Sequence, residues 1–376
     1  MVLTVADLFC GTGGFSQGFM QAGDFTVVLG IDIKKDAVET FSANNSEAIA
    51  IADDIRNVRV RDVADRLGGV RDRIDVIVGG PPCQGFSSIR PYRSINEDDR
   101  RNNLFEQYTV FVNFFRPRFL VFENVVGLMN HKGGKTLEAI RDSIEAMGYS
   151  TDLAVLNAVN YGVPQRRERI ILLGRRGKAK PSLPAATHHF DGRGMGGSLA
   201  KKSLPLFEPG LPLAVTIEKA ISDLPPVNAG KGATGYRDDV EPSEYARARR
   251  KNAKTVTLHS ATAHTPRMLE IIRLAGTNRW ALPEGLTTSG FSSCYSRLLA
   301  NEPCITITVN FVHPASNRCI HPTQDRALTP REGARIQSFD DDFVFCGSRT
   351  QIVKQIGEAV PPLLGRAIAE AVKSQV

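Results

Sequence analysis

The sequence predicts a doubly wound α/β domain followed by a second, smaller and loop-rich domain. Up to about Gly174, apolar segments of strand length alternate with amphipathic segments of helical period, which is the order of elements in a parallel sheet covered by helices. From Lys178 to about Arg326 the chain is rich in Gly, Pro, Ser, Thr and His and has few long periodic segments. A chain of 376 residues is long enough for two such domains.

Apolar runs and helical periodicity predict the individual elements. Strands are expected at residues 3–9, 26–31, 48–51, 74–78, 119–122, 153–156 and 170–173. Helices are expected at residues 34–44, 104–115 and 136–147, and short strands of the second domain at 296–298 and 305–309. A threonine cap, a proline and a glutamate predict a helix start at 328–337, and residues 355–362 are expected to turn into a last helix at 363–372.

The composition is that of a soluble globular protein, with 23% charged and 42% hydrophobic residues. No apolar run approaches the roughly 20 residues that cross a bilayer, and the first residues do not have the pattern of a signal peptide. We therefore expect a cytoplasmic protein with no membrane partner. The six cysteines form no C-x-x-C pair and no other metal-ligand spacing, which predicts free thiols and no metal site.

Basic residues gather in two places. Residues 166–180 hold seven Arg or Lys and only one acidic residue, and residues 247–254 hold five Arg or Lys. Either cluster alone could be a solvated surface. Together with a formal net charge of +7, they favour a polyanionic partner such as nucleic acid.

Cys83 lies in the stretch GGPPCQGFSS at residues 79–88, directly after the predicted strand 74–78. A lone cysteine is usually a small buried hydrophobe. A core position does not need two prolines, two glycines and two hydroxyls around it, however, and the carboxyl ends of strands in open α/β sheets are where ligands bind. We interpret Cys83 as a nucleophile on a loop at that edge.

Two further stretches place charged groups at the same edge. Glu123 directly follows the apolar strand 119–122, where a carboxylate is costly unless it is paired or used in catalysis. In the stretch QRRER, the alternate residues Gln165, Arg167 and Arg169 are expected to share one face of an extended chain.

A glycine-rich turn, CGTGGFS at residues 10–16, joins the first strand to a helix. It lacks the G-x-G-x-x-G spacing and the Lys-Ser/Thr pair of nucleotide-binding loops, which makes a nicotinamide or nucleoside triphosphate site less favoured. Asp32 ends the second strand at about the distance where a carboxylate reaches a ribose, and Asp54 could accept from an adenine amino group or cap a helix. These positions favour a cofactor that contains a nucleoside.

Taken together, these stretches resemble the cytosine-C5 DNA methyltransferase family. The matching motifs recur in the family's order and cover the amino-terminal half and about the last fifty residues; they are DLFCGTGGFSQGF, Asp32, DDI, GGPPCQGFS, DRRNNLF, ENV, QRRER, RALTPREGARIQSF and QIGEAVPP. One position departs from the family, which commonly has Asn where this chain has Glu358.

The resemblance implies a class I, Rossmann-like methyltransferase domain that binds S-adenosylmethionine. The cofactor-binding residues that it implies are Phe9, Thr12, Gly14, Asp32, Ile33, Asp54, Ile55, Pro82, Leu104 and Ala359. It implies a catalytic domain at 1–177 that is completed by 350–376, a target-recognition domain at 178–325 and a connecting segment at 326–349. The last helix is then expected to return to the amino-terminal domain.

The implied reaction also fits the residues. Addition of the Cys83 thiolate to C6 of cytosine makes C5 nucleophilic, with Glu123 at the N3 and exocyclic-amine edge, Arg169 on the O2 side and Arg167 supporting the loop. The target cytosine must be flipped out of the duplex. The resemblance therefore implies a monomeric, nucleoid-associated enzyme on double-stranded DNA, in a restriction-modification system with a cognate endonuclease.

Three alternatives remain open. A transfer RNA cytosine-C5 methyltransferase shares the catalytic motifs, although the variable region of about 150 residues favours DNA. A catalytically weak DNA-binding protein has only Glu358 in its favour. A small-molecule methyltransferase leaves Cys83, Glu123 and the arginines unexplained.

Overall fold

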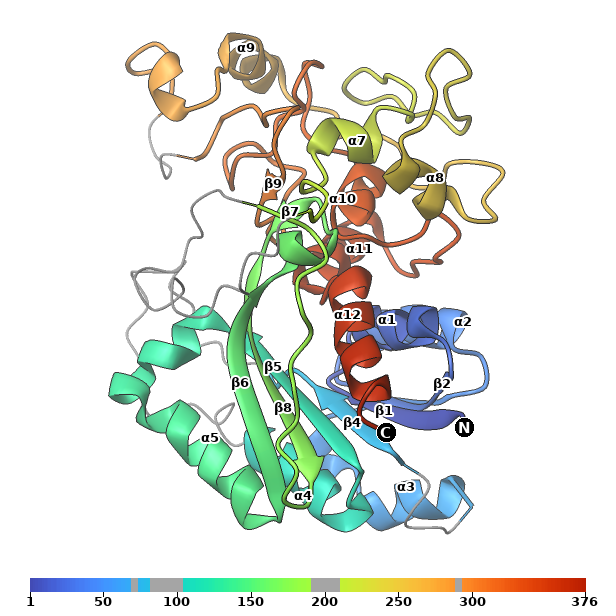
Figure 1. Ribbon diagram of the computed structural model, residues 1–376. Helices are drawn as coiled ribbons and strands as arrows, with labels where there is room; N and C mark the ends of the chain where they lie inside the picture. Colours follow the sequence, from blue (N-terminus) through green and yellow to red (C-terminus); the bar gives the residue numbers. More distant parts are fainter. Residues whose placement is uncertain (69–73, 82–103, 191–209, 288–292) are drawn as a thin grey trace.

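The computed structural model describes residues 1–68, 74–81, 104–190, 210–287 and 293–376. Within these ranges the amino-terminal half forms a seven-stranded sheet with the order β3-β2-β1-β4-β5-β8-β6 (Figure 1). The strands are β1 Leu3–Leu8, β2 Phe25–Asp32, β3 Ile49–Ala52, β4 Val76–Gly79, β5 Phe119–Val125, β6 Tyr149–Asn157 and β8 Glu168–Arg176. Neighbouring strands from β3 to β5 are parallel, whereas β8 is antiparallel to both of its neighbours.

Helices cover both faces of the sheet (Figure 1). The amino-terminal helices are α1 Gly14–Ala22, α2 Lys35–Asn44, α3 Val60–Arg66, α4 Leu104–Phe115 and α5 Lys135–Ala146, with short η1 Ile55–Asn57, η4 Val126–Gly134 and η5 Ala158–Tyr161. Apolar residues of α3, α4 and α5 form one core cluster with the sheet, and those of α1, α2 and the last helix form another. The predicted doubly wound α/β architecture is confirmed.

The last helix, α12 (Pro362–Lys373), packs beside α1 and returns the end of the chain to the amino-terminal sheet (Figure 1). The two helices approach so closely that a Cβ on Gly18 would lie 2.4 Å from the carbonyl oxygen of Pro362. A glycine is needed where two backbones approach to this distance. The predicted return of the last helix is therefore seen.

The rest of the chain is rich in loops and holds short elements. These are β7 Gln165–Arg166, α7 Ile217–Ile221, α8 Glu244–Arg250, α9 Pro266–Leu274, η6 Arg279–Ala281, β9 Cys304–Ile305, α10 Pro330–Ile336 and α11 Arg349–Glu358. Two expectations were wrong here, and a third was right only in part. Residues 355–358 belong to α11 and not to a turn, and residues 296–298 form no strand. Of the strand expected at 305–309, only Ile305 lies in a strand, β9.

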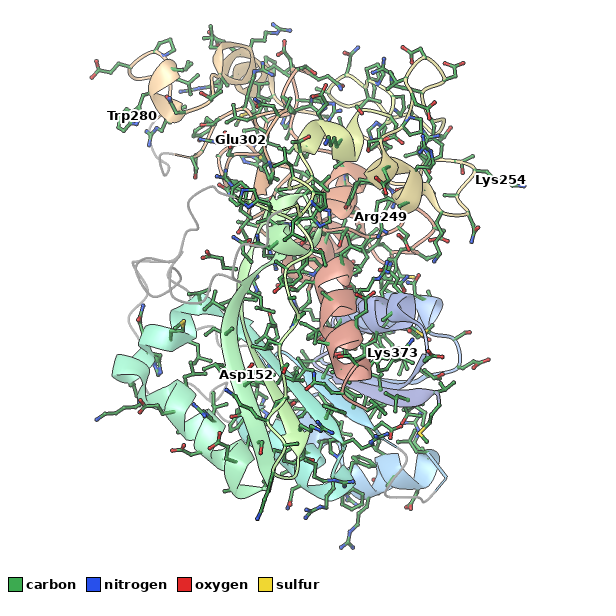
Figure 2. The ribbon with its side chains drawn as sticks, in the orientation of Figure 1. Asp152, Arg249, Lys254, Trp280, Glu302 and Lys373 are labelled. Atoms are coloured by element: carbon green, nitrogen blue, oxygen red, sulfur yellow. The ribbon has the colours of Figure 1, made fainter. Side chains whose placement is uncertain are left out.

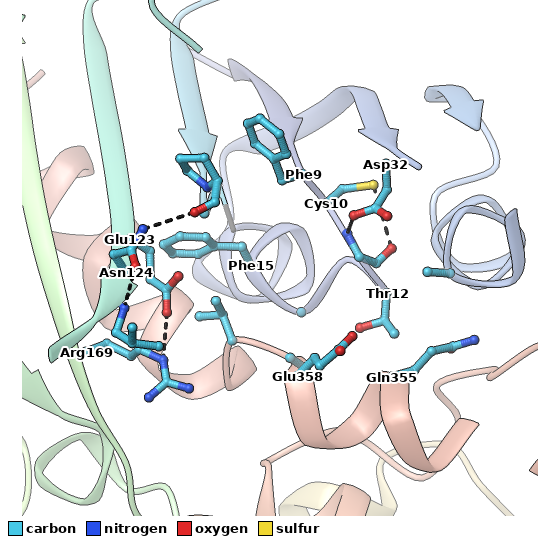
Figure 3. A pocket seen from close by; sticks show the side chains of 18 of the residues that line it. Phe9, Cys10, Thr12, Phe15, Asp32, Glu123, Asn124, Arg169, Gln355 and Glu358 are labelled. Atoms are coloured by element: carbon cyan, nitrogen blue, oxygen red, sulfur yellow. Dashed lines mark hydrogen bonds and ion pairs between the residues drawn. The ribbon is translucent and has the colours of Figure 1, made fainter. Parts of the chain in front are cut away.

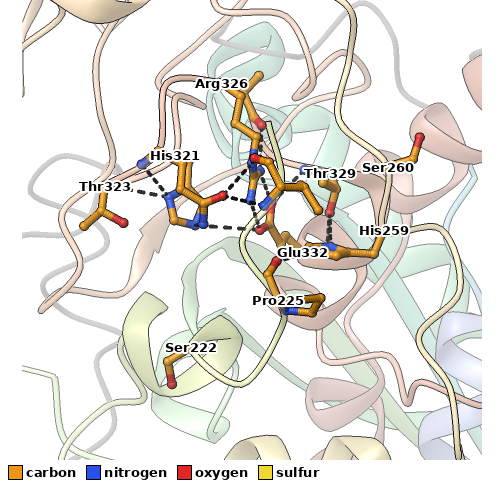
Figure 4. A network of polar contacts seen from close by, with 12 residues as sticks. Ser222, Pro225, His259, Ser260, His321, Thr323, Arg326, Thr329 and Glu332 are labelled. Carbon is orange, nitrogen blue, oxygen red and sulfur yellow. Dashed lines mark hydrogen bonds and ion pairs between the residues drawn. The ribbon is translucent and has the colours of Figure 1, made fainter. Parts of the chain in front are cut away.

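Buried ion pairs hold α10 in place. The capping box predicted at Thr329 and Glu332 is present, and Glu332 also accepts two hydrogen bonds from Arg326, at 2.8 and 2.7 Å (Figure 4). Arg335, which is fully buried, pairs with Asp223 at 3.0 Å and with Asp341 at 2.6 Å. Charged groups are rarely buried unless they are paired in this way.

The second basic cluster is partly structural. Arg249 is buried and pairs with Asp340 at 2.9 Å, and Arg250 pairs with Asp223 at 2.7 Å. Lys254 instead projects from the edge of the molecule (Figure 2). Arg247 and Lys251 also pair with carboxylates, Arg247 with Glu241 and Lys251 with Asp340 at 3.4 Å, but their side chains are 60% and 45% exposed.

No helix in the described parts is long and apolar enough to cross a membrane. The five cysteines in these parts are free thiols. Among the same residues, His, Cys, Asp and Glu side chains form no group that could hold a metal ion.

Candidate active site and cofactor pocket

A pocket of about 710 Å³ opens at the carboxyl edge of the sheet. It is bounded by the ends of β1, β2, β4 and β5, the start of β8, and the end of α11. Nine of the ten predicted cofactor residues line it, namely Phe9, Thr12, Gly14, Asp32, Ile33, Asp54, Ile55, Leu104 and Ala359. The tenth, Pro82, lies outside the described residues.

The glycine-rich turn after β1 shapes one wall of this pocket. Phe9, Gly11 and Gly13 all have positive φ angles, of 63°, 50° and 81°. The turn is fixed to β2, because Asp32 accepts a hydrogen bond from the Gly11 amide at 2.9 Å and another from the Lys34 amide at 2.9 Å. Burial raises the pKa of Asp32, although these two hydrogen bonds oppose the shift.

Two polar groups beside the turn stand out. The Thr12 hydroxyl is buried and has no hydrogen-bond partner among the described residues, although Thr12 lines the pocket (Figure 3). A buried hydroxyl without a partner is costly, so this oxygen is available to a ligand. Asp7 also lines the pocket; burial raises its pKa to about 7, although its carboxylate accepts a 2.6 Å hydrogen bond from Ser16.

The carboxylate of Asp54 already has protein partners. It caps η1 by accepting from the Arg56 amide at 3.0 Å, and the Arg56 guanidinium donates to it at 2.9 Å. Hydrogen bonding from Arg56 lowers the pKa of Asp54. The helix cap that the sequence allowed is present, and both oxygens of the carboxylate accept hydrogen bonds from Arg56.

Glu123 and Arg169 meet at the other end of the pocket (Figure 3). Their side chains come from the carboxyl end of β5 and the start of β8, which are paired in antiparallel register. The Nε atom of Arg169 lies 2.8 Å from Oε1 of Glu123, and only 14% and 12% of the two side chains are exposed. Burial lowers the pKa of Arg169, and the Glu123 carboxylate opposes that shift.

The segment of the chain that leads to Cys83 starts next to this pair. Cys83 itself lies outside the described residues, but Gly80 and Pro81 precede it and line the pocket. Asn124 donates a 3.0 Å hydrogen bond to the Pro81 carbonyl, which ties Pro81 to β5. A Cβ on Gly80 would lie 2.7 Å from Oε2 of Glu123, so the absence of a side chain there leaves room for the carboxylate.

Arg167 occupies a different environment from Arg169. It lies between β7 and β8, is 2% exposed, and donates to the carbonyl oxygens of Gly357 at 3.1 Å and Glu358 at 3.3 Å. Burial, with repulsion from Arg169, lowers the pKa of Arg167 well below its usual range. Gln165 is also buried and contacts Gln337. Arg167 and Gln165 therefore hold the carboxyl-terminal segment, while Arg169 holds Glu123.

Sequence reasoning missed several residues that line or shape the pocket. Gly80 and Asn124 stand in the motifs GGPPCQGFS and ENV, so their positions were visible although their contacts were not. Lys34 follows Asp32 by two residues and forms an ion pair with Glu358. No local signal could have found that pair, because its partners are 324 residues apart.

The comparisons with known proteins agree on one family. The family model described as C-5 cytosine-specific DNA methylase matches residues 3–374. The type II methyltransferase M.AgeI of Thalassovita gelatinovora is 34% identical over 98% of this chain and 98% of its own. M1.HphI of Haemophilus parahaemolyticus, also named a type II methyltransferase, is 34% identical over 99% of this chain and 87% of its own.

Solved structures share the fold over nearly the whole chain. An Escherichia coli protein described as a DNA modification methyltransferase encoded within a prophage matches with a TM-score of 0.72 and 25% identity, over 99% of both chains. The S. pombe Dnmt2 methyltransferase matches with a TM-score of 0.58 at 14% identity, which shows the fold alone. The match of the family model to residues 3–374 shows that this chain belongs to the C-5 cytosine-specific DNA methylases and is a DNA (cytosine-5-)-methyltransferase.

Proposed function

We propose that Cys83, Glu123 and Arg169 act together on a cytosine of duplex DNA, with S-adenosylmethionine bound in the adjoining part of the same pocket. The observation that carries this proposal is the Glu123–Arg169 pair, 2.8 Å apart and nearly buried. It lies beside Gly80 and Pro81, from which the chain continues to Cys83. In this proposal Cys83 supplies the nucleophile beside the carboxyl group of Glu123 and the cation of Arg169.

Glu123 and Arg169 suit the polar edge of a cytosine. A carboxyl group can donate to N3 and accept from the exocyclic amine, and a guanidinium can donate to O2. Because both side chains are largely removed from water, their hydrogen bonds to the base are stronger than they would be at the surface. The arginine also holds the carboxyl group in place before the base arrives.

Cys83 supplies the covalent step. Its thiolate adds to C6, and the electron pair of the C5–C6 bond moves toward N3, where Glu123 stabilises the developing charge. The methyl group on C5 would come from the sulfonium of the cofactor, whose sulfur would keep the electron pair of the broken S–CH3 bond and leave as S-adenosylhomocysteine. Loss of the C5 proton to a base then returns the electron pair of the C5–H bond to the ring as the C5–C6 double bond. The C6–sulfur bond then breaks and releases the thiolate. The one covalent bond to the enzyme, between sulfur and C6, is thus formed and broken, and the thiolate is regenerated.

The pocket also suits the cofactor. S-adenosylmethionine would supply an electrophilic methyl group. The residues that would hold it are the nine predicted ones that line the pocket, together with Pro82. The unpartnered Thr12 hydroxyl supports this fit, because it is a buried polar group that lacks a partner in the described parts of the chain. Asp32, fixed by two backbone amides, would accept from the ribose hydroxyls.

Arg167 is proposed as a positioning residue and not as one that touches the base. Its guanidinium binds the carbonyls at the end of α11, which is the segment that closes the pocket beside Ala359. Loss of this cation would loosen the wall of the cofactor pocket, because buried carbonyl groups would lose their donors.

The substrate is proposed to be a short recognition sequence within duplex DNA. The names of the curated relatives, type II methyltransferases, favour a modification enzyme that works beside a cognate restriction endonuclease. The second, loop-rich part would contact base edges while exposed cations bind phosphates. We further propose a monomer that acts on nucleoid DNA in the cytoplasm.

Transfer of labelled methyl from S-adenosylmethionine to plasmid DNA and, in parallel, to transfer RNA tests the proposal. The control is Cys83→Ala, and base-resolution mapping of 5-methylcytosine follows. Label in DNA at one recurrent short sequence, lost in the variant, supports the whole assignment. Label in RNA alone would contradict it, and label that persists in the variant would remove Cys83 from the reaction.

A further inference from the structure

The end of the pocket away from Glu123 and Arg169 carries a second pair of opposite charges. Lys34, just after β2, forms an ion pair with Glu358, the last residue of α11. Both residues line the pocket, and Figure 3 shows Glu358 near Thr12 and far from the Glu123–Arg169 pair. The two charged side chains are each 47% exposed, so they remain accessible to a ligand that enters from solvent.

The backbone beneath Glu358 is fixed by buried contacts. Arg167 donates to the carbonyls of Gly357 and Glu358. A Cβ on Gly357 would lie 2.4 Å from the Thr308 carbonyl oxygen, which shows how closely this turn is packed. The carboxylate of Glu358 is therefore held at one place in the pocket wall by its backbone, while its side chain is free to exchange partners.

We propose that Lys34 and Glu358 recognise the amino-acid end of S-adenosylmethionine, and this inference rests on the cofactor proposed above. Glu358 accepts from the α-ammonium group and Lys34 donates to the α-carboxylate. The ion pair between the two side chains is thereby exchanged for two ion pairs with the ligand. An exposed ion pair contributes little to stability, so little is lost when it opens.

The charges and their placement favour this occupant. Asp32, which is proposed to bind the ribose, is separated from Lys34 by one residue, and the Lys34 amide donates to its carboxylate. A zwitterionic group next to the ribose meets one cation and one anion at this point of the pocket. A DNA phosphate would be attracted by Lys34 but repelled by Glu358, so the pair suits a ligand that carries both signs.

Calorimetric binding of four ligands tests the inference. S-adenosylmethionine and its decarboxylated form differ only in the carboxylate. S-adenosylhomocysteine and methylthioadenosine differ by the whole amino-acid group. Lys34→Met is expected to raise Kd about tenfold for the two ligands that carry the carboxylate and to leave the other two unchanged. Glu358→Gln is expected to raise Kd about tenfold for the three ligands that carry the ammonium group and to leave methylthioadenosine unchanged.

Lys35→Met is the matched control, because Lys35 is the next residue, is exposed and does not line the pocket. Equal affinities of the wild type and both variants for every ligand would overturn the inference, and so would an equal loss for methylthioadenosine, which has no charged end. If the wild type bound none of the four ligands, the cofactor assignment itself would fail and this inference with it. The two failures are thus told apart by the wild-type titration.

Discussion

Arg169 places its Nε atom 2.8 Å from Oε1 of Glu123, across the antiparallel pairing of β8 with β5. This contact joins an acid and a base from strands that are more than 40 residues apart in sequence. In our account the arginine orients the carboxyl group and the pair then binds the polar edge of the base.

Glu123→Gln is expected to lower kcat by about 10²- to 10⁴-fold, because the amide keeps the shape but cannot supply a proton to N3. The change also leaves the largely buried Arg169 without its anion, so the melting temperature should fall as well, and kcat is compared at a temperature where both proteins are folded. Arg175→Ala is the control; Arg175 lies on β8, the strand that also carries Arg169, but packs over Phe119 at the end of β5 away from Glu123. A Glu123→Gln enzyme that kept wild-type kcat would remove the carboxyl group from the reaction.

Gly80→Ala tests whether the position of Glu123 matters as well as its identity. The added methyl group would lie 2.7 Å from Oε2 of Glu123, so the carboxyl group must move, and a displacement of this size costs about 10²-fold in kcat. Gly235→Ala is a matched control, since a Cβ there meets nothing within 4 Å. Single-turnover methyl transfer would measure the rates of both variants. Equal rates for Gly80→Ala and Gly235→Ala would show that the reaction tolerates displacement of the carboxyl group.

Asp7 should make stability fall as the pH rises. Burial raises its pKa from 3.8 to about 7 in the folded protein, so between these values the folded state holds a proton that the unfolded chain has lost. The favourable contribution of Asp7 to the free energy of unfolding is complete below about pH 4 and is lost as the pH rises through 7.

Urea unfolding of the wild type and Asp7→Asn at pH 4.5 and pH 8 measures this contribution. The amide oxygen of the variant can still accept from Ser16. Between pH 4.5 and pH 8, the free energy of unfolding of the variant should rise relative to that of the wild type by on the order of a few kcal/mol. A difference that does not depend on pH would show that Asp7 does not titrate in this range.

Glu332→Gln is expected to destabilise the protein by about 3–5 kcal/mol, because it leaves the buried Arg326 guanidinium without its anion. Burial alone would raise the pKa of Glu332, but Arg326 lowers it to about 2. The contribution of the Glu332–Arg326 pair to the free energy of unfolding is therefore present above about pH 4.5 and is lost as the pH falls toward 2. Glu270→Gln, at an exposed site, should change the free energy of unfolding by less than about 0.5 kcal/mol; a similar loss in both variants would contradict this account.

The elements near the active site could be predicted because their signals are local. Each strand of the sheet is a short apolar run, and Asp32 and Glu123 stand where such runs end. The predicted helix at 104–115 matches α4, Leu104–Phe115. The helix α11 was missed although Ser348 and Gln351 form a capping box at its start, because it has only three apolar residues and its end runs into the Gly and Pro residues of QIGEAVPP.

Contacts between distant segments could not be predicted. Alternation suggested that Arg167 and Arg169 share one face, but the chain leaves its strand between β7 and β8, and Arg167 turns toward α11. From the sequence, the cations at 247–254 were expected to lie at the surface of the protein. Arg249 and Arg250 are instead paired with carboxylates from other segments, whose proximity depends on the fold.

The central claim is that Cys83 forms a bond to C6 of the target cytosine, and covalent trapping tests it most directly. A duplex oligonucleotide of the mapped recognition sequence would carry 5-fluorocytosine at the target position. Fluorine cannot leave C5 as a proton does, so the bond to sulfur cannot be released after methyl transfer. The account predicts a denaturation-resistant complex that requires S-adenosylmethionine and is absent with Cys83→Ala. A wild-type enzyme that methylates the unmodified sequence but forms no such complex, or a complex that persists in the variant, would contradict it.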